Sequence, residues 1–522
     1  MSRSLEKIIE AMSDPAVYPH GPESVQVIQT HISVIFIAGD LVYKVKKPLN
    51  FGFLDFTTLE KRVHFCRQEV RLNSRFSEGI YLGVVMIYEG LSGVNLAGEG
   101  EPIEAAVEMR RLPEERVMLK MLEQDAVSDE ILDRLAIRLA SLHSQAVTGP
   151  EIAHFGSPEV ILHNLYENFD QTEPFVGRTL DRDTHGQISF LSTEFLRTHE
   201  SLIRLRVDSG FIRDCHGDLH LDHVVIMNGI VLFDCIEFND RFRYGDTASD
   251  LAFLLMDLDF QGYPAFADRI GRVYADTRGD RDALRLLGFY KSYRAFVRGK
   301  VSGFTLDEPE ISKQDKEAAR QTARHYFHLS RAYLEPPAPS LVITCGLMGT
   351  GKSFLAAKLA RRMGIDYLKS DRIRKEILGI SPGEHRLDKY GKGIYTSDAT
   401  YMTYDALLEK GRKALEQGRS VILDASFMQS THRARARDLA RSKNAGFRIL
   451  YCTAAEDVIR RRLDDRIKRL DEPSDGRSEI FEEQRSRFEP IRQSEQKDSR
   501  EWDSTTDADR FLVMVVRELM VH

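Results

Sequence analysis

The chain has 522 residues, of which 42% are hydrophobic and 29% are charged, and this is the composition of a folded protein with two or three domains. Its formal net charge is −7, from 73 basic and 80 acidic side chains, so it gives no general attraction to nucleic acid or to membranes. Five scattered cysteines without a C-x-x-C pair argue against a disulfide framework or a zinc site. The sequence also has no apolar segment typical of a signal peptide or a membrane span, so we expect a cytoplasmic protein without a membrane partner.

Strand-forming residues dominate the start of the chain, and helical patterns follow. Two short strands are predicted to flank the segment from His216 to Asp218, and the chain from there to Leu334 is mostly helical. A small strand-rich lobe followed by a helical lobe is the layout of a two-lobed, protein-kinase-like α+β fold. The predicted strands are 25–28, 32–37 and 41–45, and the predicted helices include about 58–76 and 129–143.

A proline-rich segment divides the chain. Pro336, Pro337 and Pro339 cannot continue a helix, and they favour a stiff, extended linker. An apolar run at 341–345 follows, which is typical of a buried strand. The sequence therefore predicts two domains, 1–335 and 336–522.

The segment after this strand carries a phosphate-binding motif, G-x-x-x-x-G-K-S, between a predicted strand and a predicted helix. Glycines let backbone N–H groups curl around phosphate oxygens, and the helix N-terminus adds partial positive charge. Lys352 is expected to contact the β- and γ-phosphates of ATP, and the Ser353 hydroxyl to contact Mg²⁺. The residues predicted to bind the nucleotide here are Gly346, Gly349, Gly351, Lys352 and Ser353.

Two acidic residues in this half are candidates for catalysis and metal binding. Asp371 and Arg374 are three residues apart, so they share one face of a helix that begins there. Asp371 could accept a hydroxyl proton, and Arg374 could hold an anionic group beside it. Asp424 ends an apolar strand, where a carboxylate typically lies near Mg²⁺ or its water shell. The alternatives are an acidic helix turn with a solvated arginine, and an ordinary strand-end turn.

A helix rich in arginine follows. Arg462 and Arg466 are four residues apart and share one face, and many kinases close such a helix over the transferring phosphate. A salt-bridged surface helix is the alternative. With the D-x-x-R pair at Asp371, these arginines make residues 340–510 resemble the P-loop kinases related to polynucleotide kinase and zeta toxin. The resemblance implies a three-layer α/β P-loop NTPase fold with a parallel sheet, Asp371 as general base, an arginine lid, and phosphoryl transfer to a hydroxyl.

A second motif lies in the first half of the chain. The sequence His216-Gly-Asp218 opens a loop, and a strand, a turn and a second strand ending at Asp234 follow. This pattern resembles the catalytic loop and metal-binding acid of the aminoglycoside phosphotransferases and related choline-type kinases. The resemblance implies that Asp218 helps to deprotonate an acceptor hydroxyl and that Asp234 binds Mg²⁺. Asp246 and Asp250 fall in a G-D-x-x-x-D-L-A segment whose acids are mainly structural in that family.

Residues further upstream extend this resemblance. Lys44 and Lys46 point the same way on a strand, so either could be the lysine that contacts ATP, and we prefer Lys44 because it follows an apolar triplet. Glu69 would be the ion-pair partner of that lysine. Glu108 and Met109 fall where the segment that holds adenine is expected.

The resemblance spans most of residues 25–330 and has one departure that matters. His223 stands five residues after Asp218, where the family has a metal-binding asparagine. An amide oxygen suits Mg²⁺, and an imidazole is a poorer match. His220 and His223 with Asp222 could also suggest a transition-metal site, although we favour packing and loop hydrogen bonds as the explanation.

These motifs together predict an ATP- and Mg²⁺-dependent phosphotransferase that moves the γ-phosphate to hydroxyl acceptors, with a P-loop kinase domain and a second small-molecule kinase domain. The expected partner is a small hydroxyl compound, and a nucleic-acid end is an alternative that we do not favour. Two other hypotheses stay open. One is a single-activity P-loop kinase with a non-catalytic, regulatory kinase-like domain, and the other is an ATPase switch that acts on a macromolecular partner.

Overall fold

The computed structural model describes the whole chain except residues 1–2, 92, 309–310, 381–395, 469–477 and 522, together with the side chains of 3–4, 466–468 and 478–480. The described chain forms two compact units. The first comprises Met1–Asp257 and Ala267–Ser330, and the second comprises Leu258–Phe266 and Arg331–His522. The predicted domain boundary between residues 335 and 336 lies near the later of these divisions.

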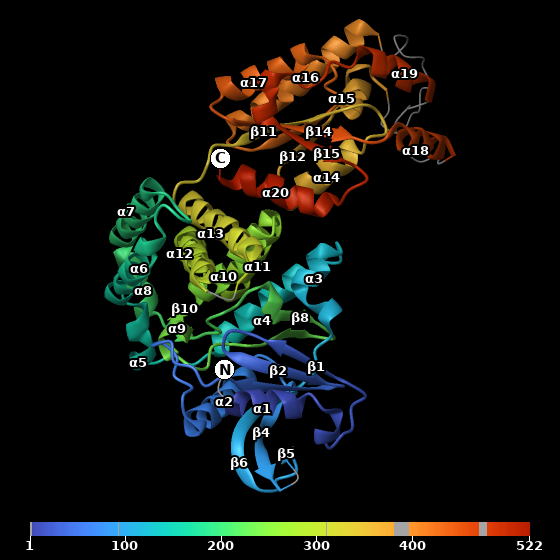
Figure 1. Ribbon diagram of the computed structural model, residues 1–522. Coiled ribbons are helices and arrows are strands. Elements are labelled where there is room, and N and C mark those ends of the chain that lie inside the picture. Colours follow the sequence, from blue (N-terminus) through green and yellow to red (C-terminus); the bar gives the residue numbers. More distant parts are fainter. Residues whose placement is uncertain (1–2, 92, 309–310, 381–395, 469–477, 522) are drawn as a thin grey trace. The chain divides into compact units, whose positions relative to one another are not determined.

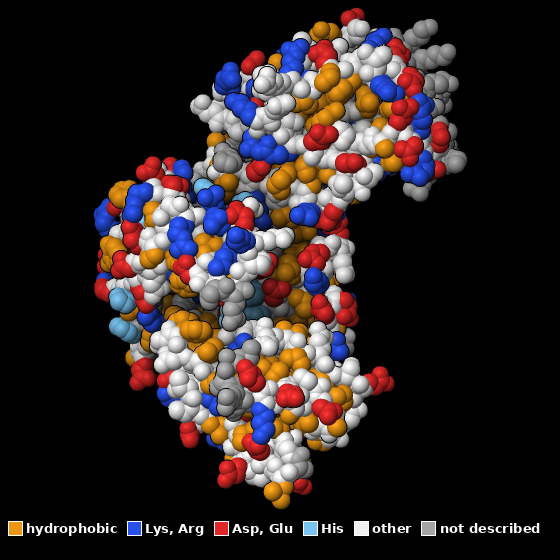
Figure 2. Space-filling view, viewed as in Figure 1, with side chains coloured by type: hydrophobic (Ala, Val, Ile, Leu, Met, Phe, Trp, Pro, Cys, Tyr) orange, Lys and Arg blue, Asp and Glu red, His pale blue; other side chains and the backbone are white. Residues whose placement is uncertain are grey.

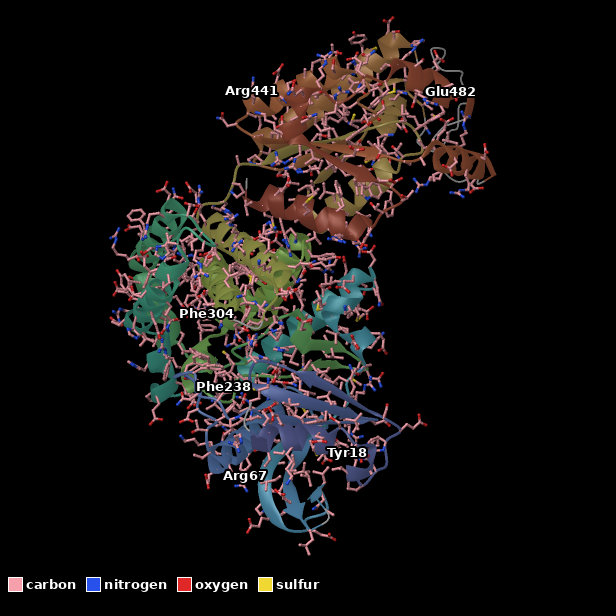
Figure 3. The ribbon with its side chains drawn as sticks, in the orientation of Figure 1. Tyr18, Arg67, Phe238, Phe304, Arg441 and Glu482 are labelled. Atoms are coloured by element: carbon pink, nitrogen blue, oxygen red, sulfur yellow. The ribbon has the colours of Figure 1, made fainter. Side chains whose placement is uncertain are left out.

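An antiparallel sheet with the strand order β1-β2-β3-β6-β4-β5 forms the first lobe of the first unit (Figure 1). One face packs on helix α1 (Arg3–Met12) through a core that includes Phe36, Val45 and Tyr18. The buried Tyr18, labelled in Figure 3, donates its hydroxyl hydrogen to the Met12 carbonyl at 2.6 Å. The strands are β1 (Val25–Gln29), β2 (Ser33–Ala38), β3 (Leu41–Lys46), β4 (Tyr81–Gly90), β5 (Gly93–Asn95) and β6 (Glu101–Arg110).

Helix α2 (Leu59–Asn73) packs on strands β4 and β6. The helix begins after Thr58, whose hydroxyl accepts a hydrogen bond from the Lys61 N–H at 3.3 Å, and it ends before the predicted limit at residue 76. Cys66 of this helix packs with Val107 of β6 in a buried cluster. This packing also buries Glu69 completely, so its carboxylate requires charged partners inside the unit.

Helices and two short strand pairs make up the second lobe of the first unit (Figure 1). Strand β7 (Ile212–Asp214) pairs with β10 (Tyr244–Asp246), and β8 (Val224–Ile226) pairs with β9 (Ile230–Leu232). Strands β7 and β8 flank the segment from His216 to Asp218, as the sequence predicted. The α-helices of this part of the chain are α3 (Met118–Glu123), α4 (Asp129–Gln145), α5 (Pro150–Ala153), α6 (Pro158–Thr172), α7 (Arg182–Thr198), α8 (Glu200–Asp208), α9 (Asp240–Arg243), α10 (Thr247–Phe260), α11 (Pro264–Arg278), α12 (Asp282–Phe304) and α13 (Lys313–Leu334).

The second unit is built on a parallel five-stranded sheet with the order β12-β13-β11-β14-β15 (Figure 1). Helices cover both of its faces, so a strand such as β11 is an unbroken apolar run. Leu341 packs toward α16 and α17, whereas Val342 packs toward α14 and α20. The strands are β11 (Ser340–Cys345), β12 (Asp366–Lys369), β13 (Val421–Asp424), β14 (Gly446–Thr453) and β15 (Ser499–Asp503). The α-helices are α14 (Lys352–Met363), α15 (Ser370–Ile377), α16 (Ser397–Glu416), α17 (Ser430–Ser442), α18 (Glu456–Lys468), α19 (Ser478–Arg487) and α20 (Ala508–Val521).

This architecture confirms the predicted fold classes. The first unit has the two lobes of a kinase-like fold, and the second has the three layers and parallel sheet of a P-loop fold. All five cysteines are buried and free, so they pack as small apolar side chains. Among the described residues, none of the helices combines the length and the apolar character needed to cross a membrane.

Candidate active sites

The predicted phosphate-binding loop connects β11 to α14, and its backbone requires glycine. Gly346 has a φ of +139°, and a Cβ atom there would lie 2.3 Å from the Cys452 carbonyl oxygen of β14. Gly349 and Gly351 also have positive φ values, of 77° and 86°. The loop therefore keeps a tight left-handed course that leads directly into the N-terminus of α14, whose first N–H groups have no partner within the helix.

Lys352 is the first residue of α14 and reaches back over this loop. Its Nζ donates a hydrogen bond to the Leu347 carbonyl at 2.6 Å. Burial lowers the pKa of Lys352, while the negative charges of Asp424 and Asp371 oppose this shift. Two of the predicted site carboxylates therefore act electrostatically on the predicted phosphate-binding lysine.

Asp424 is 3% exposed and ends β13 beside Lys369 of β12. Its Oδ1 accepts a hydrogen bond from Thr344 at 3.2 Å, and its Oδ2 accepts one from the Tyr367 hydroxyl at 2.8 Å. Tyr367 also interacts with the side chain of Ser353. The predicted magnesium ligands Ser353 and Asp424 are thus linked through one tyrosine, and their donors are oxygen atoms of the kind that Mg²⁺ prefers, so this site fits the ion.

Asp371 lies in the first turn of α15 and is partly exposed. Its charge acts on Lys352 and on Tyr367, so the structure brings it to the phosphate-binding loop. Arg374, one turn further, is only 8% exposed, and its charge acts on the buried Tyr404. It is therefore not the solvated arginine that the sequence left open as an alternative.

Helix α18 packs directly on the phosphate-binding loop. Ile459 and Leu463 form a small apolar cluster with Leu347 and Met348 of the loop. Arg462 donates from Nη1 to the Gly349 carbonyl at 3.2 Å and to Ser504 at 2.7 Å, and from Nη2 to the Ser504 carbonyl at 3.1 Å.

The structure thus places one of the two predicted lid arginines on the loop itself. The side chain of the other, Arg466, lies outside the described residues.

In the first unit, three of the predicted residues form one ion network. The Lys44 ammonium of β3 is 2.9 Å from Glu69 Oε1 of α2, and it forms an ion pair with Oδ1 of Asp234, which follows β9. Burial alone would lower the pKa of Lys44, but the charges of Asp234 and Glu69 raise it well above its ordinary value. Asp234 has a φ of +61°, which is uncommon for a residue other than glycine, and its N–H donates to the Tyr81 hydroxyl at 3.0 Å.

Lys46 also contacts Glu69, so the roles of the two lysines have to be assigned from their other contacts and their exposure. Its Nζ lies 2.6 Å from Glu69 Oε2 and forms an ion pair with Glu237, and its side chain is 1% exposed. The Lys44 side chain is 12% exposed and contacts Asp234. Lys44 is therefore the lysine that faces the predicted metal-binding acid, and Lys46 belongs to the core beneath it.

The loop that carries Asp218 is held by its backbone. Asp250 of α10 accepts hydrogen bonds from the N–H groups of His216 at 3.1 Å and Gly217 at 2.8 Å, one on each carboxylate oxygen. The structural role that the resemblance implied for Asp250 thus has a clear basis. The carboxylate fixes the two residues that immediately precede Asp218.

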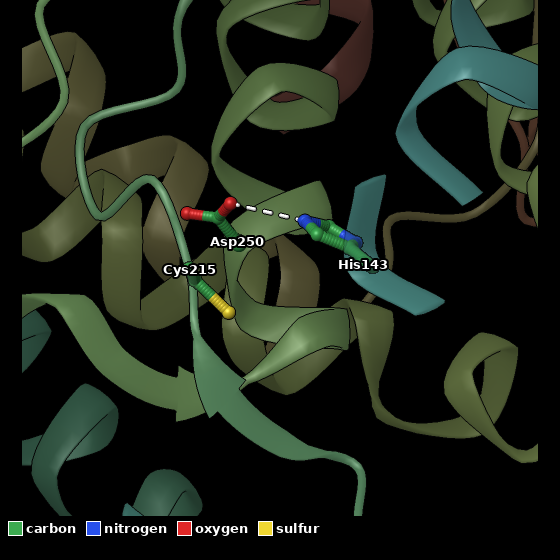
Figure 4. Close-up of side chains that lie close together, drawn as sticks. All are labelled: His143, Cys215 and Asp250. Atoms are coloured by element: carbon green, nitrogen blue, oxygen red, sulfur yellow. Dashed lines mark hydrogen bonds and ion pairs between the residues drawn. The ribbon is translucent and has the colours of Figure 1, made fainter. Parts of the chain in front are cut away.

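Asp250 also lies in a buried group with His143 and Cys215 (Figure 4). The spacing of these three side chains could accommodate a metal ion. However, His143 is hydrogen-bonded through one ring nitrogen to Asp250 at 3.1 Å and through the other to the Tyr274 hydroxyl at 2.7 Å. Because both nitrogens have partners, this group acts as a brace for the loop, and the sequence alone gave no signal for the part played by His143.

Asp218 lies within a cluster of histidines. Its Oδ2 is 3.7 Å from His220 Nε2 and 3.8 Å from His223 Nδ1. Burial would raise the pKa of the Asp218 carboxyl, but the neighbouring histidines outweigh burial and hold this pKa below its ordinary value. The space-filling view shows a hollow on this face between the two lobes of the first unit, with histidine atoms at its floor (Figure 2).

His223 lies between the predicted catalytic acid Asp218 and the predicted metal-binding acid Asp234. Its Nδ1 is 2.8 Å from the Asp218 carbonyl oxygen, and its Nε2 is 3.7 Å from Asp234 Oδ2. It therefore occupies the place expected for the second metal ligand. Its nitrogen donor does not fit Mg²⁺, which binds hard oxygen ligands.

Comparison with known proteins also divides the chain into two domains. Residues 66–287 match the Phosphotransferase enzyme family (APH), and residues 341–491 match the AAA domain family AAA_33. Uncharacterized protein Rv2004c of Mycobacterium tuberculosis is 32% identical over 459 residues, which cover 87% of this chain and 88% of that protein. Uncharacterized protein Mb2027c of Mycobacterium bovis matches with the same values. The chain belongs to the family of these mycobacterial proteins.

As a member of this family, the chain joins an aminoglycoside-phosphotransferase-like domain to a P-loop kinase domain, and it is a nucleotide-binding phosphotransferase. Among solved structures, a choline/ethanolamine kinase family protein from Mesorhizobium loti is 13% identical, with a TM-score of 0.40, and the match covers 63% of this chain and 96% of that one. The APS kinase CysC from Mycobacterium tuberculosis, in complex with AMPPNP and APS, is 18% identical, with a TM-score of 0.24 and coverages of 35% and 98%.

Several contacts in this family member could not be found from the sequence. Tyr367 and Thr344 hold Asp424, Ser504 holds Arg462, and Tyr81 holds the backbone of Asp234. Each partner is an ordinary hydroxyl residue to which the motifs assign no role. Only the register of neighbouring strands and the path of distant loops bring it to its site.

Proposed function

We propose that the second unit transfers the γ-phosphate of ATP to a hydroxyl group of a small molecule. The observation that carries this proposal is the convergence on one glycine loop of a lysine, two carboxylates and an arginine, namely Lys352, Asp371, Asp424 and Arg462. The second carboxylate, Asp371, lies close enough to act on Lys352, so it can serve as the base that transfer to a hydroxyl needs.

Each side chain has a role that follows from its position. Lys352 exchanges its hydrogen bond to the Leu347 carbonyl for phosphate oxygens, and its buried charge is stronger there than it would be in water. Asp371 accepts the proton of the acceptor hydroxyl. Arg462 stabilises negative charge as the phosphoryl group moves, and Arg374 holds an anionic part of the acceptor. The resemblance assigns the same role to Arg466, whose side chain lies outside the described residues.

Mg²⁺ held by Ser353 and Asp424 would neutralise charge on the β- and γ-phosphates when it is bound. The Tyr367 hydroxyl positions both ligand side chains for this purpose.

We propose that the first unit is a second small-molecule kinase. Asp218 orients the acceptor hydroxyl and receives its proton late in the transfer, because a carboxylate with a depressed pKa is a weak base. Lys44, held by Glu69, binds the phosphates of ATP. A hydroxyl compound of low molecular weight is the expected acceptor in both units, since the net charge of −7 gives no general attraction to a nucleic acid.

Labelled ATP and a panel of hydroxyl compounds test this proposal with the full-length chain. Asp371→Ala should reduce transfer by the second unit by about 10²- to 10⁴-fold, as is typical when a general base is removed. Asp398→Ala is the matched control, because Asp398 is an exposed acid in the first turn of α16, and it should leave transfer unchanged.

The alternatives predict different results. An ATPase switch would release inorganic phosphate without any labelled product, and the Asp371→Ala variant would retain that hydrolysis. If the label appeared on the end of an oligonucleotide, the acceptor would be a nucleic acid and not a small molecule. Loss of every product in a Lys352→Ala variant would indicate a single-activity enzyme with a regulatory first unit.

A further inference from the structure

The tautomer of His223 is fixed by its surroundings. Its Nδ1 lies 2.8 Å from the carbonyl oxygen of Asp218, and a carbonyl oxygen can only accept a hydrogen bond. Nδ1 therefore carries the hydrogen, and Nε2 presents a lone pair. In metal sites, a histidine ligand usually donates its other N–H to a backbone carbonyl or a carboxylate in this way, which orients the ring.

One particular carboxylate oxygen lies near Nε2. Nε2 is 3.7 Å from Asp234 Oδ2, while the other oxygen of Asp234, Oδ1, is paired with Lys44. A separation of 3.7 Å is too long for a hydrogen bond. Two ligands that each lie about 2.1 Å from one ion are about 3.4 Å apart on a tetrahedron and about 3.0 Å apart when they are cis on an octahedron. Nε2 and Oδ2 therefore need to approach by only about 0.3–0.7 Å to share an ion.

We propose that the first unit binds its nucleotide together with a divalent first-row transition metal ion, for which Mn²⁺ is the probe, held by Nε2 of His223 and Oδ2 of Asp234. Imidazole nitrogen strengthens the binding of such ions, and it is a poor ligand for Mg²⁺. This inference rests on the proposed nucleotide binding of the first unit. It also gives the replacement of asparagine by His223 a chemical meaning, since this single position changes the metal preference.

His220 is the neighbouring histidine that provides a control. Its ring packs against that of His223 with 3.9 Å between centroids, but its nitrogens face other groups. Nδ1 of His220 is 3.6 Å from Asp222, and Nε2 is 3.7 Å from Asp218. In the proposed site, His220 supports the His223 ring and does not ligate the ion.

The test is pulsed electron paramagnetic resonance of Mn²⁺ bound to the full-length chain with a non-hydrolysable ATP analogue. An imidazole ligand gives a ¹⁴N coupling on Mn²⁺, whereas Ser353 and Asp424 of the second unit offer only oxygen. We expect the coupling in the wild type and in His220→Asn, and its loss in His223→Asn. The Mn²⁺ affinity of the first unit should fall at least about tenfold in His223→Asn, while its Mg²⁺ affinity stays equal or rises.

Three results would overturn the inference. Bound Mn²⁺ and nucleotide without ¹⁴N coupling in the wild type would do so without any variant, even if His223→Asn failed to fold, and the proposed kinase function would still stand. Loss of the coupling in His220→Asn but not in His223→Asn would place the ion elsewhere in the histidine cluster. A stoichiometry of one nucleotide per chain, abolished by Lys352→Ala, would instead remove the proposed nucleotide site of the first unit, and the inference with it.

Discussion

The two candidate sites of this chain are built in opposite ways. In the second unit, the glycine loop, Lys352 and Ser353 form one contiguous segment, and its tight backbone is the main structural device. In the first unit, Lys44, Glu69 and Asp234 come from three distant segments and meet through buried ion pairs. The first design depends on local backbone geometry and the second on the packing of a whole domain, so mutations should affect them differently.

Buried charges explain why mutations should affect the stability of the two sites differently. A backbone loop needs no charged partners to keep its shape, whereas removing one partner of a buried ion pair leaves the other charged group uncompensated. In the first unit, function and stability should therefore be linked. In the second unit, the Lys352 side chain can be removed with little effect on the fold, because it is hydrogen-bonded only to a loop carbonyl among the contacts described.

The largest effect is expected in the contiguous site. Lys352→Ala should reduce transfer by the second unit by about 10³-fold, because a charged donor aimed at the phosphates is lost. The melting temperature should change little, since Nζ of Lys352 bonds only to a loop carbonyl among the contacts described. Activity assays and thermal unfolding of the same preparation measure both quantities. A large loss of stability would contradict the view that this site is local.

Asp218→Ala should reduce transfer by the first unit by about 10²-fold or more, as expected for the loss of a positioned proton acceptor. Transfer by the second unit should remain at the wild-type rate in the same chain. Once both acceptors are identified, phosphate transfer to each of them can be measured with the same preparation. Equal losses for both acceptors would mean that the chain has a single phosphotransferase site.

The two lysines of β3 test whether nucleotide binding and stability depend on different residues of the first unit. Lys46→Met leaves the buried Glu69 and Glu237 with one cation fewer, and it should lower the free energy of unfolding by about 3 kcal/mol. Lys44→Met should weaken nucleotide binding and reduce transfer by this unit by about 10²-fold, with a smaller loss of stability, because Lys46 still pairs with Glu69. Thermal unfolding and nucleotide titration distinguish the two variants. If Lys46→Met keeps its stability and loses nucleotide binding, the roles of the two lysines are reversed.

The smallest effect is expected for Asp250, which is hydrogen-bonded to His143 and holds the loop that carries Asp218. Burial would raise the pKa of Asp250, but its hydrogen bond and charge interaction with His143 outweigh burial, and its pKa in the folded chain is depressed. A depressed pKa contributes stability that is present above the unfolded value of about 3.9 and is lost as the pH falls below it. Asp250→Asn should therefore cost about 1–3 kcal/mol at pH 7 and make the first unit less sensitive to acid.

Melting curves of wild type and Asp250→Asn between pH 7 and pH 3 measure this difference. Asp222→Asn is the control, since the Asp222 side chain is mostly exposed and is expected to have little effect. Parallel pH profiles for wild type and Asp250→Asn would show that Asp250 does not stabilise the loop through its charge.

Much of the fold could be predicted because its elements are local. The strand 421–424 and the helix from residue 129 are present as predicted, since β-branched runs and helical spacing act over a few residues. The residues proposed to contact the phosphate acceptor could be predicted only in part. The sequence placed Asp371 and Arg374 on one helix face, but it could not show that Arg374 would be buried, because burial depends on helices and strands far along the chain.

The sequence by itself determined the phosphate loop of the second unit, because glycine conformations and a helix N-terminus are properties of adjacent residues. It also determined that His223 replaces an asparagine. Only the tertiary structure decided that Lys44 pairs with Asp234 while Lys46 is buried beneath it, and that one nitrogen of His223 lies near Asp234. The physical reason is that charge pairing over long sequence distances depends on how two lobes fold against each other, and residue spacing along the chain does not record that.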